Sequence, residues 1–295
     1  MNSKIVISGK RFCSLLFALC FLLFLTGCGH PLHKAEIKLA SIKVYEIKGQ
    51  EAFEAKDIPV ANYCFKTALD LYASINRLEG VIRSYNNLAA VALSKADYVK
   101  AKEYLHQAQE IEENYHYPEG KAVTLNLWAN YFSGQRSLDR AIRSELEAIK
   151  ISKKYNLKEP LATACNNLGE IYLREGKVVE AEKLFKEAVS INKRRKHWSN
   201  LAINYYNLGM IYLRKRDLRE AKIFLEKALE YDQRALYSQG IAADLEMLAQ
   251  IAIEEGHLNH ATFYLRQALE VYKGIDDKEK IAEIEKKLKE IARGS

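Results

Sequence analysis

The sequence predicts an all-α protein, an α-solenoid of six tandem helix pairs closed by a C-terminal capping helix. Three observations predict it. Small residues recur at a constant interval at three positions, as from Ala61 to Ala101 and on to Ala141. Apolar residues within each period follow helical spacing, and helix breakers are scarce, with 14 Gly and 4 Pro in the whole chain. Scarce breakers also argue against an all-β chain, which needs a turn signal about every ten residues.

The chain begins with a segment typical of a targeting signal. A positively charged start precedes an almost wholly apolar run over residues 12–25, which is shorter than the roughly 20 residues that a membrane-spanning helix needs. We expect residues 1–27 to be a signal peptide and residues 28–35 to be a tether. The alternative is an uncleaved N-terminal anchor, and in both cases the chain is held at a membrane.

The end of this segment is more specific than a generic cleavage site. Leu25-Thr26-Gly27-Cys28 resembles the bacterial lipobox, which implies cleavage before Cys28 and acylation of its thiol. Several acyl chains anchor a protein stably because each buried methylene contributes about 0.8 kcal/mol. The next residue is Gly29 rather than the aspartate associated with inner-membrane retention. The resemblance therefore implies a lipoprotein, palmitoylated at Cys28, on the periplasmic face of the outer membrane.

Residues 36–275 are expected to form the six repeats, each with two amphipathic helices. In the fourth repeat, residues 164–174 and 178–191 have apolar side chains at helical spacing, with a turn between them. Helices can stack closely only where the crossing residues are small, because a large side chain would wedge them apart. The three small series are Ala61, Ala101, Ala141, Ala181, Ala221, Ala261; Ala68, Ala108, Ala148, Ala188, Ala228, Ala268; and Gly49, Ala89, Ala129, Gly169, Gly209, Ala249.

Other positions in the repeats support these boundaries. Residues that cap helices well stand before four of the second helices. The third repeat departs from the pattern, since Glu145 replaces the usual Phe or Leu and Leu146 lies beside it, so we expect its second helix to be slightly rotated. Residues 276–295 predict a charged capping helix. The four expected N-caps are Asp57, Asp97, Ser137 and Asp217.

The order of residues within a repeat resembles a known family. Leu168, Gly169 and Tyr172, followed by Ala181, Phe185 and Ala188, resemble the tetratricopeptide repeat. The usual unit of that family has about 34 residues. The longer unit of this chain, which runs from Ala61 to Ala101 and repeats without insertion, is similar to the kinesin-light-chain type. The resemblance covers the chain from about position 36 to position 275, and it implies a right-handed superhelix whose concave groove binds protein segments.

By this resemblance, an asparagine series on the first helices would line the groove. A carboxamide both donates and accepts hydrogen bonds, which suits capture of an extended peptide backbone. The alternative is that these residues fill a polar face or tie neighbouring first helices together. Three arginines at the groove or its edge could pair with acidic groups of a ligand, or be solvated. The groove candidates are Asn86, Asn87, Asn126, Asn166, Asn167, Asn207, Arg83, Arg174 and Arg214.

A carboxylate clamp for C-terminal peptides is not expected. Asn130 and Asn167 match two of its positions, but Asn126, Ile203 and Asn207 stand where the clamp needs lysine, lysine and arginine. The sequence therefore does not predict this mode of binding.

The sequence does not predict an enzyme, a cofactor or a metal site. It has no phosphate-binding loop, no nucleophile elbow and no His-Glu-x-x-His pattern. His257 and His260 stand three positions apart without a third ligand nearby, so we expect solvated histidines. Cys64 and Cys165 are too distant in a solenoid to form a disulfide, and we expect Cys165 to be a buried apolar residue.

The functional prediction is a membrane-anchored scaffold or adaptor that binds a protein segment in an envelope assembly, secretion or export complex. The net charge of +7 falls to +4 without the three basic residues of the expected signal peptide, and a balance that mild, spread along the chain, does not indicate nucleic-acid binding. No small-molecule substrate is expected. The alternative is a glycan- or lipid-handling lipoprotein, since Tyr206, Arg174 and Arg214 could hold an anionic polysaccharide.

Overall fold

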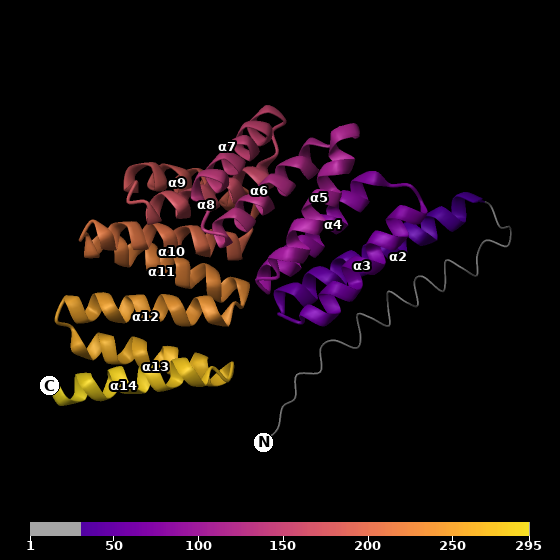
Figure 1. Cartoon of the computed structure of the whole chain (residues 1–295). Helices are drawn as coiled ribbons and strands as arrows, with labels where there is room; N and C mark the ends of the chain where they lie inside the picture. The colour runs from indigo at the N-terminus through magenta and orange to yellow at the C-terminus, as the bar shows by residue number, and fades with distance from the viewer. Residues whose placement is uncertain (1–30, 295) are drawn as a thin grey trace, which may run out of the picture. The chain divides into compact units, whose positions relative to one another are not determined.

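A computed structural model describes residues 31–294, and every regular element in that range is an α-helix (Figure 1). The predicted all-α helical-repeat solenoid is confirmed. The predicted signal peptide and Cys28 lie outside the described residues. The helices are α2 (Pro31–Glu54), α3 (Ile58–Ser74), α4 (Leu78–Ser94), α5 (Tyr98–Asn114), α6 (Pro118–Gly134), α7 (Leu138–Lys154), α8 (Lys158–Arg174), α9 (Val178–Arg195), α10 (Trp198–Arg214), α11 (Leu218–Ala235), α12 (Ser238–Glu254), α13 (Leu258–Gly274) and α14 (Lys278–Gly294).

The described residues form two compact units, and the division between Ser84 and Tyr85 falls inside α4. In the first unit α2 packs against α3. In the second unit each first helix from α6 to α12 packs against its own second helix and against the second helix before it, and the capping helix α14 packs against α13. Helix α2 begins at Pro31, earlier than the predicted start of the repeats at residue 36. No helix between residues 31 and 294 is both long enough and apolar enough to span a membrane.

Equal helices and similar turns explain why the period is constant along the chain. Helices α3 to α8 each have 17 residues. A short turn with one residue in the left-handed region follows nearly every described helix. Gly176 (φ 78°) takes this conformation without steric cost, while Ala96 (φ 54°) and Leu236 (φ 56°) take it as non-glycine residues. Among the turns between α2 and α14, the α5–α6 turn alone lacks a left-handed residue, because Tyr115 is extended there.

Three of the four predicted N-caps are confirmed by a hydrogen bond. The carboxylates of Asp57, Asp97 and Asp217 accept from backbone N–H groups three positions later, at 3.2, 3.2 and 3.1 Å. Ser137 occupies the N-cap position of α7, but its side chain makes no capping bond.

The small residues mark the helix crossings, as predicted. All the alanines of the two second-helix series are completely buried. In the first-helix series, a Cβ added to Gly169 would lie 2.8 Å from the Phe185 ring, and one added to Gly209 would lie 2.7 Å from Leu225 Cγ. The large residues therefore fill the space that each small residue leaves on the facing helix.

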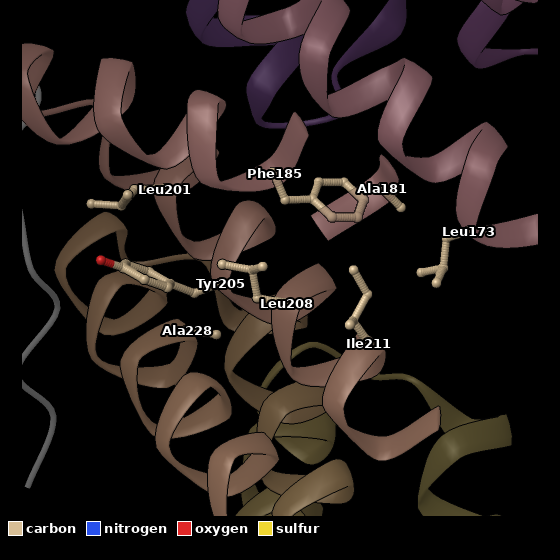
Figure 2. Close-up of a cluster of buried hydrophobic side chains, with 8 residues drawn as sticks. All are labelled: Leu173, Ala181, Phe185, Leu201, Tyr205, Leu208, Ile211 and Ala228. Carbon is tan, nitrogen blue, oxygen red and sulfur yellow. The ribbon is translucent and has the colours of Figure 1, made fainter. Parts of the chain in front are cut away.

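The hydrophobic core runs along the stack of helices. The cluster in Figure 2 takes side chains from α8, α9, α10 and α11, so it joins the fourth repeat to the fifth. Other clusters of the second unit likewise take side chains from neighbouring repeats, which is the behaviour of a solenoid. The cluster comprises Leu173, Ala181, Phe185, Leu201, Tyr205, Leu208, Ile211 and Ala228.

The expected rotation of the second helix in the third repeat is wrong. Glu145 is completely buried together with Ala141 and Ala148, whereas Leu146 is 47% exposed. Helix α7 thus keeps the register of the other second helices and places a carboxyl group in the core. Close packing of the two small alanines against the facing helices fixes this register more strongly than the apolar character of Leu146 could change it.

Candidate functional site

One repeat position on the first helices makes contacts with the following first helix in several repeats. In the first unit, Glu46 of α2 binds Arg83 at 3.1 Å. In the second unit, Asn86 Nδ2 donates to Gly120 O at 3.5 Å and Asn126 Nδ2 donates to Pro160 O at 3.1 Å. Glu246, at the same position in α12, binds Lys287 of the cap at 3.2 Å. This position therefore forms a ladder of contacts between consecutive first helices.

The fourth and fifth repeats extend the ladder into an asparagine network. Asn192 Nδ2 of α9 donates to Asn204 Oδ1 of α10 at 2.8 Å, and Asn204 Nδ2 donates to Asn166 Oδ1 of α8 at 2.8 Å. Asn207 Nδ2 also donates to Asn166 Oδ1, at 3.2 Å, and Asn166 Nδ2 donates to Glu170 at 2.8 Å. Three helices are thus joined through amide side chains whose hydrogen-bonding groups are largely paired.

A small cavity of about 200 Å³ opens beside this network. Asn166 and Asn167 of α8 and Asn204 of α10 line it, together with Asn200 and Ile203, which lie on the exposed side of α10. Asn167 Nδ2 donates to the buried carboxyl of Glu145 at 2.8 Å. Two predicted groove residues therefore meet here.

The other predicted groove residues lie apart from this cavity. Asn86 and Asn126 are buried in the contacts described above, each 3% exposed, and Asn87 is half-buried on α4. Asn207 is also buried, within the network. The asparagines of this series that form hydrogen bonds in the structure form them mainly with neighbouring repeats. A ligand-binding role for these asparagines stays a prediction.

The three arginines predicted to line the groove all interact with other residues of the same chain. Arg83 Nη2 donates to Tyr72 Oη at 2.8 Å besides its ion pair with Glu46. Arg174 pairs with Glu170 at 3.6 Å, four positions earlier on the same helix. Arg214 donates to the main-chain carbonyl of Leu173, at the C-terminal end of α8. Arg214 thus adds a side-chain donor to a carbonyl that also accepts from the backbone N–H of Gly176 at 3.3 Å.

Sequence reasoning missed a second recurring polar position, at the joints between repeats. A residue near the end of a second helix faces one that lies twelve positions later, on the next first helix. Asn192 and Asn204 form one such joint; Thr124 Oγ1 donates to Glu112 at 2.6 Å in another. The available signal was a polar residue at equivalent places of several repeats.

The joint between α11 and α12 holds two carboxyl groups. Asp232 is 5% exposed and Asp244 is 1% exposed, and neither has a basic partner in the part of the chain described. Burial raises the pKa of Asp232 to about 6, and burial together with the neighbouring Asp232 raises the pKa of Asp244 to about 8. Burial likewise raises the pKa of Glu112 to about 7. These groups retain protons in the folded chain at pH values where they would ionise in water.

Within the described residues, the two cysteines and the histidine pair named in the sequence analysis form no catalytic arrangement. Cys64 and Cys165 are buried free thiols, and burial raises the pKa of Cys165 to about 12. The rings of His257 and His260 are exposed, 5.7 Å apart, and His257 lies 3.3 Å from Glu255. Within residues 31–294, no three His, Cys, Asp or Glu side chains gather as a metal site would require.

Comparison with models of known protein families identifies the same repeat that the sequence predicted. One model of the tetratricopeptide repeat matches residues 160–234, and a second matches residues 82–115 and 245–274. The chain contains tetratricopeptide repeats. No curated protein is significantly similar to it in sequence.

Solved structures of tetratricopeptide-repeat type share the fold. BtubC (BKLC) from P. vanneervenii has a TM-score of 0.62 at 20% identity, over 81% of this chain and 92% of that chain. The Rap protein complexed with Competence and Sporulation Factor has a TM-score of 0.62 at 16% identity, over 86% and 75%. The nearly identical TPR-like repeats of a putative kinesin light chain from Podosopora anserina have a TM-score of 0.52 at 18% identity, over 67% and 97%. The predicted likeness to kinesin-light-chain repeats is thus confirmed for the fold.

Proposed function

We propose that this protein is a membrane-anchored interaction scaffold that binds an extended segment of a protein partner on its first-helix face. The observation that carries the proposal is the asparagine-lined cavity between α8 and α10 within a stack of tetratricopeptide repeats. Exposed amide groups can donate to and accept from a peptide backbone, and Ile203, which is 42% exposed, adds an apolar contact. The partner belongs to an envelope assembly, secretion or export complex, as the lipobox resemblance suggests.

A similar structure supports this proposal. The Rap protein, which shares the fold, was solved in complex with Competence and Sporulation Factor, so a stack of this kind can bind a partner. In the present chain most asparagines of the network bind one another, whereas Asn200 is exposed at the cavity mouth. The paired amides hold the helices in place, and the exposed Asn200 and Ile203 remain for a ligand.

The test is a pull-down from envelope extract with the chain and two matched double variants. Asn200→Ala with Ile203→Ala removes the exposed cavity residues, and Asn259→Ala with Phe263→Ala removes another exposed pair, one amide and one apolar residue, from α13. We expect the first variant to lose its main partners at least tenfold and the second to keep them. Equal retention by both variants, at equal helicity and melting temperature, would reject the cavity as the binding site.

Membrane anchoring is tested separately at Cys28. If its thiol is acylated, Cys28→Ser will lose the acyl mass seen by intact-mass spectrometry, and the protein will leave the membrane fraction. Cys165→Ser is the control, because that thiol is completely buried in the fold. An unchanged mass for Cys28→Ser would contradict the lipoprotein proposal.

The alternative role in glycan handling gains no support from the geometry. Tyr206 is partly buried and packs against the hydrophobic core, so little of its ring is available to stack on a glycan. Arg214 and Arg174 already bind a carbonyl and a carboxylate of α8. The peptide-binding role therefore remains the one that we propose.

A further inference from the structure

A larger cleft lies away from the asparagine-lined cavity, on α5, α6 and α7. Its volume of about 530 Å³ falls within the range of roughly 300–1,000 Å³ typical of ligand sites. Trp128 and Phe132 stack at 5.4 Å in its wall, and the His106 ring meets Trp128 edge-on at 5.1 Å. The guanidinium of Arg140 lies 4.0 Å above the Phe132 ring. The cleft thus presents an aromatic wall with a cationic edge.

The cleft lies where the third repeat lacks the aromatic pair that the second and fifth repeats have. In the fifth repeat Tyr205 stacks with Phe224 at 6.2 Å, and in the second repeat Tyr85 lies 6.3 Å from Tyr104. The equivalent residues in the third repeat are Leu125 and Ser144, and both line the cleft. An aromatic ring is therefore missing where the repeat geometry elsewhere accommodates one.

The turn before α6 also distinguishes this place. It lacks the left-handed residue found in the other described turns, because Tyr115 is extended there, and Pro118 is the first residue of α6. This turn joins α5 to α6, and residues of both helices line the cleft.

Trp128 is not explained by packing alone. The ring is 9% exposed, and its Nε1–H is buried without an acceptor in the described part of the chain. An unpaired buried donor costs about 1–3 kcal/mol. Leucine would avoid this cost, and four other repeats have leucine at this position: Leu88, Leu168, Leu208 and Leu248.

The charges around the cleft favour an acidic ligand. Lys102, Lys121 and Arg140 line it, against Glu112 and Glu113. Glu112 carries only part of a negative charge near neutral pH, because burial raises its pKa to about 7. Lys102 and Lys121 are exposed, so they can pair with carboxylates of a ligand.

We infer that this cleft binds an aromatic side chain of a protein partner, flanked by acidic residues, with the ring in the space beside Ser144 and Leu125. The inference adds a second contact to the proposed scaffold. It does not involve the asparagine-lined cavity, so the two sites can be tested independently.

The test uses the purified full-length chain in detergent, with Trp198→Phe leaving Trp128 as the only tryptophan. The probes are the peptides acetyl-Asp-Phe-Asp-amide and acetyl-Asp-Leu-Asp-amide, titrated while Trp128 emission is recorded. We expect a saturable change, with the phenylalanine peptide bound at least tenfold more tightly than the leucine peptide. The same peptide with lysines in place of the aspartates should bind more weakly, and this difference should shrink at high salt.

Two variants test the location. Ser144→Phe fills the cleft as Phe224 does in the fifth repeat, so binding should fall at least tenfold while the melting temperature is kept; Arg143→Ala, next to it on α7, should change neither. If Ser144→Phe does not fold, Lys102→Glu with Lys121→Glu should weaken binding of the acidic peptide at least fivefold. No response to the phenylalanine peptide, or the same affinity in the cleft variants, would overturn the inference. Loss of the response in the Asn200→Ala, Ile203→Ala variant would instead move the site to the asparagine-lined cavity.

Discussion

Glu145 stands where the equivalent residues of the other repeats are Phe65, Leu105, Phe185, Leu225 and Leu265, and it is buried as completely as they are. Its Oε1 accepts from Asn167, but its Oε2 has no partner in the described part of the chain. Burial raises the pKa of Glu145 well above the usual range, which favours the neutral form of the carboxyl group. A neutral carboxyl is tolerated in the core at the cost of one unpaired oxygen.

Replacing Glu145 with leucine should therefore stabilise the protein. Leucine fits this position in three other repeats, and the change removes a buried polar group that is only partly paired. We expect Glu145→Leu to raise the free energy of unfolding by about 1–3 kcal/mol at pH 7, measured by urea denaturation. Glu147→Leu, on the exposed side of the same helix, should change it by less than about 0.5 kcal/mol. A loss of stability in Glu145→Leu would show that the carboxyl group is required.

Helices of this stack are held at fixed spacing by small residues, which makes the crossings intolerant of larger side chains. Ala181 of α9 is completely buried in the cluster of Figure 2, close to Phe185 and the residues of α10. Added methylene groups have no space there without movement of a helix.

We expect Ala181→Leu to lower the free energy of unfolding by about 1–3 kcal/mol through overpacking. Val179→Leu is the matched control, since Val179 lies on the same helix and is 75% exposed. Thermal unfolding followed by circular dichroism measures both. An unchanged melting temperature for Ala181→Leu would mean that this position is not a helix crossing.

At the scale of the whole molecule, several acidic residues are buried at the joints between repeats. Their raised pKa values make the free energy of unfolding depend on pH. The pKa values of Asp232, Asp244 and Glu112 are raised to about 6, 8 and 7, whereas in an unfolded chain such groups titrate near 4. Between pH 4 and 8 the folded chain therefore binds more protons than the unfolded chain. Stability contributed by these protons is complete below about pH 4 and is lost as the pH rises through the folded pKa values.

We expect the free energy of unfolding to decrease from pH 5 to pH 9, measured by denaturant titration at each pH. Asp244→Asn should reduce this slope, because an amide cannot ionise and can still donate to Asp232. Contacts with Lys186, Lys215 and Tyr212 lower the pKa of Glu182 to about 2. Its titration therefore changes the free energy of unfolding mainly below pH 5, outside the range measured. A free energy of unfolding that rises with pH would contradict the assignment.

The described fold could be predicted because its signals are local. Helical spacing, N-cap residues and small residues at a constant interval lie within single helices or at equal steps along the chain, so they can be read without knowing how helices stack. The site was less predictable. The asparagines were found by their repeat position, but the contacts of Asn166 with Asn204 and Asn207 join residues 38 and 41 positions apart.

The helical repeats, their length and their crossings follow from patterns within the chain. The tertiary structure alone decided that Glu145 is buried without rotation of its helix, that Asp232 and Asp244 meet at a joint, and that Ser144 leaves a cleft beside Trp128. The physical reason is that burial and pairing of polar groups depend on side chains brought together from different repeats. Stacking geometry and the turns set these contacts, and no local pattern in the chain encodes them.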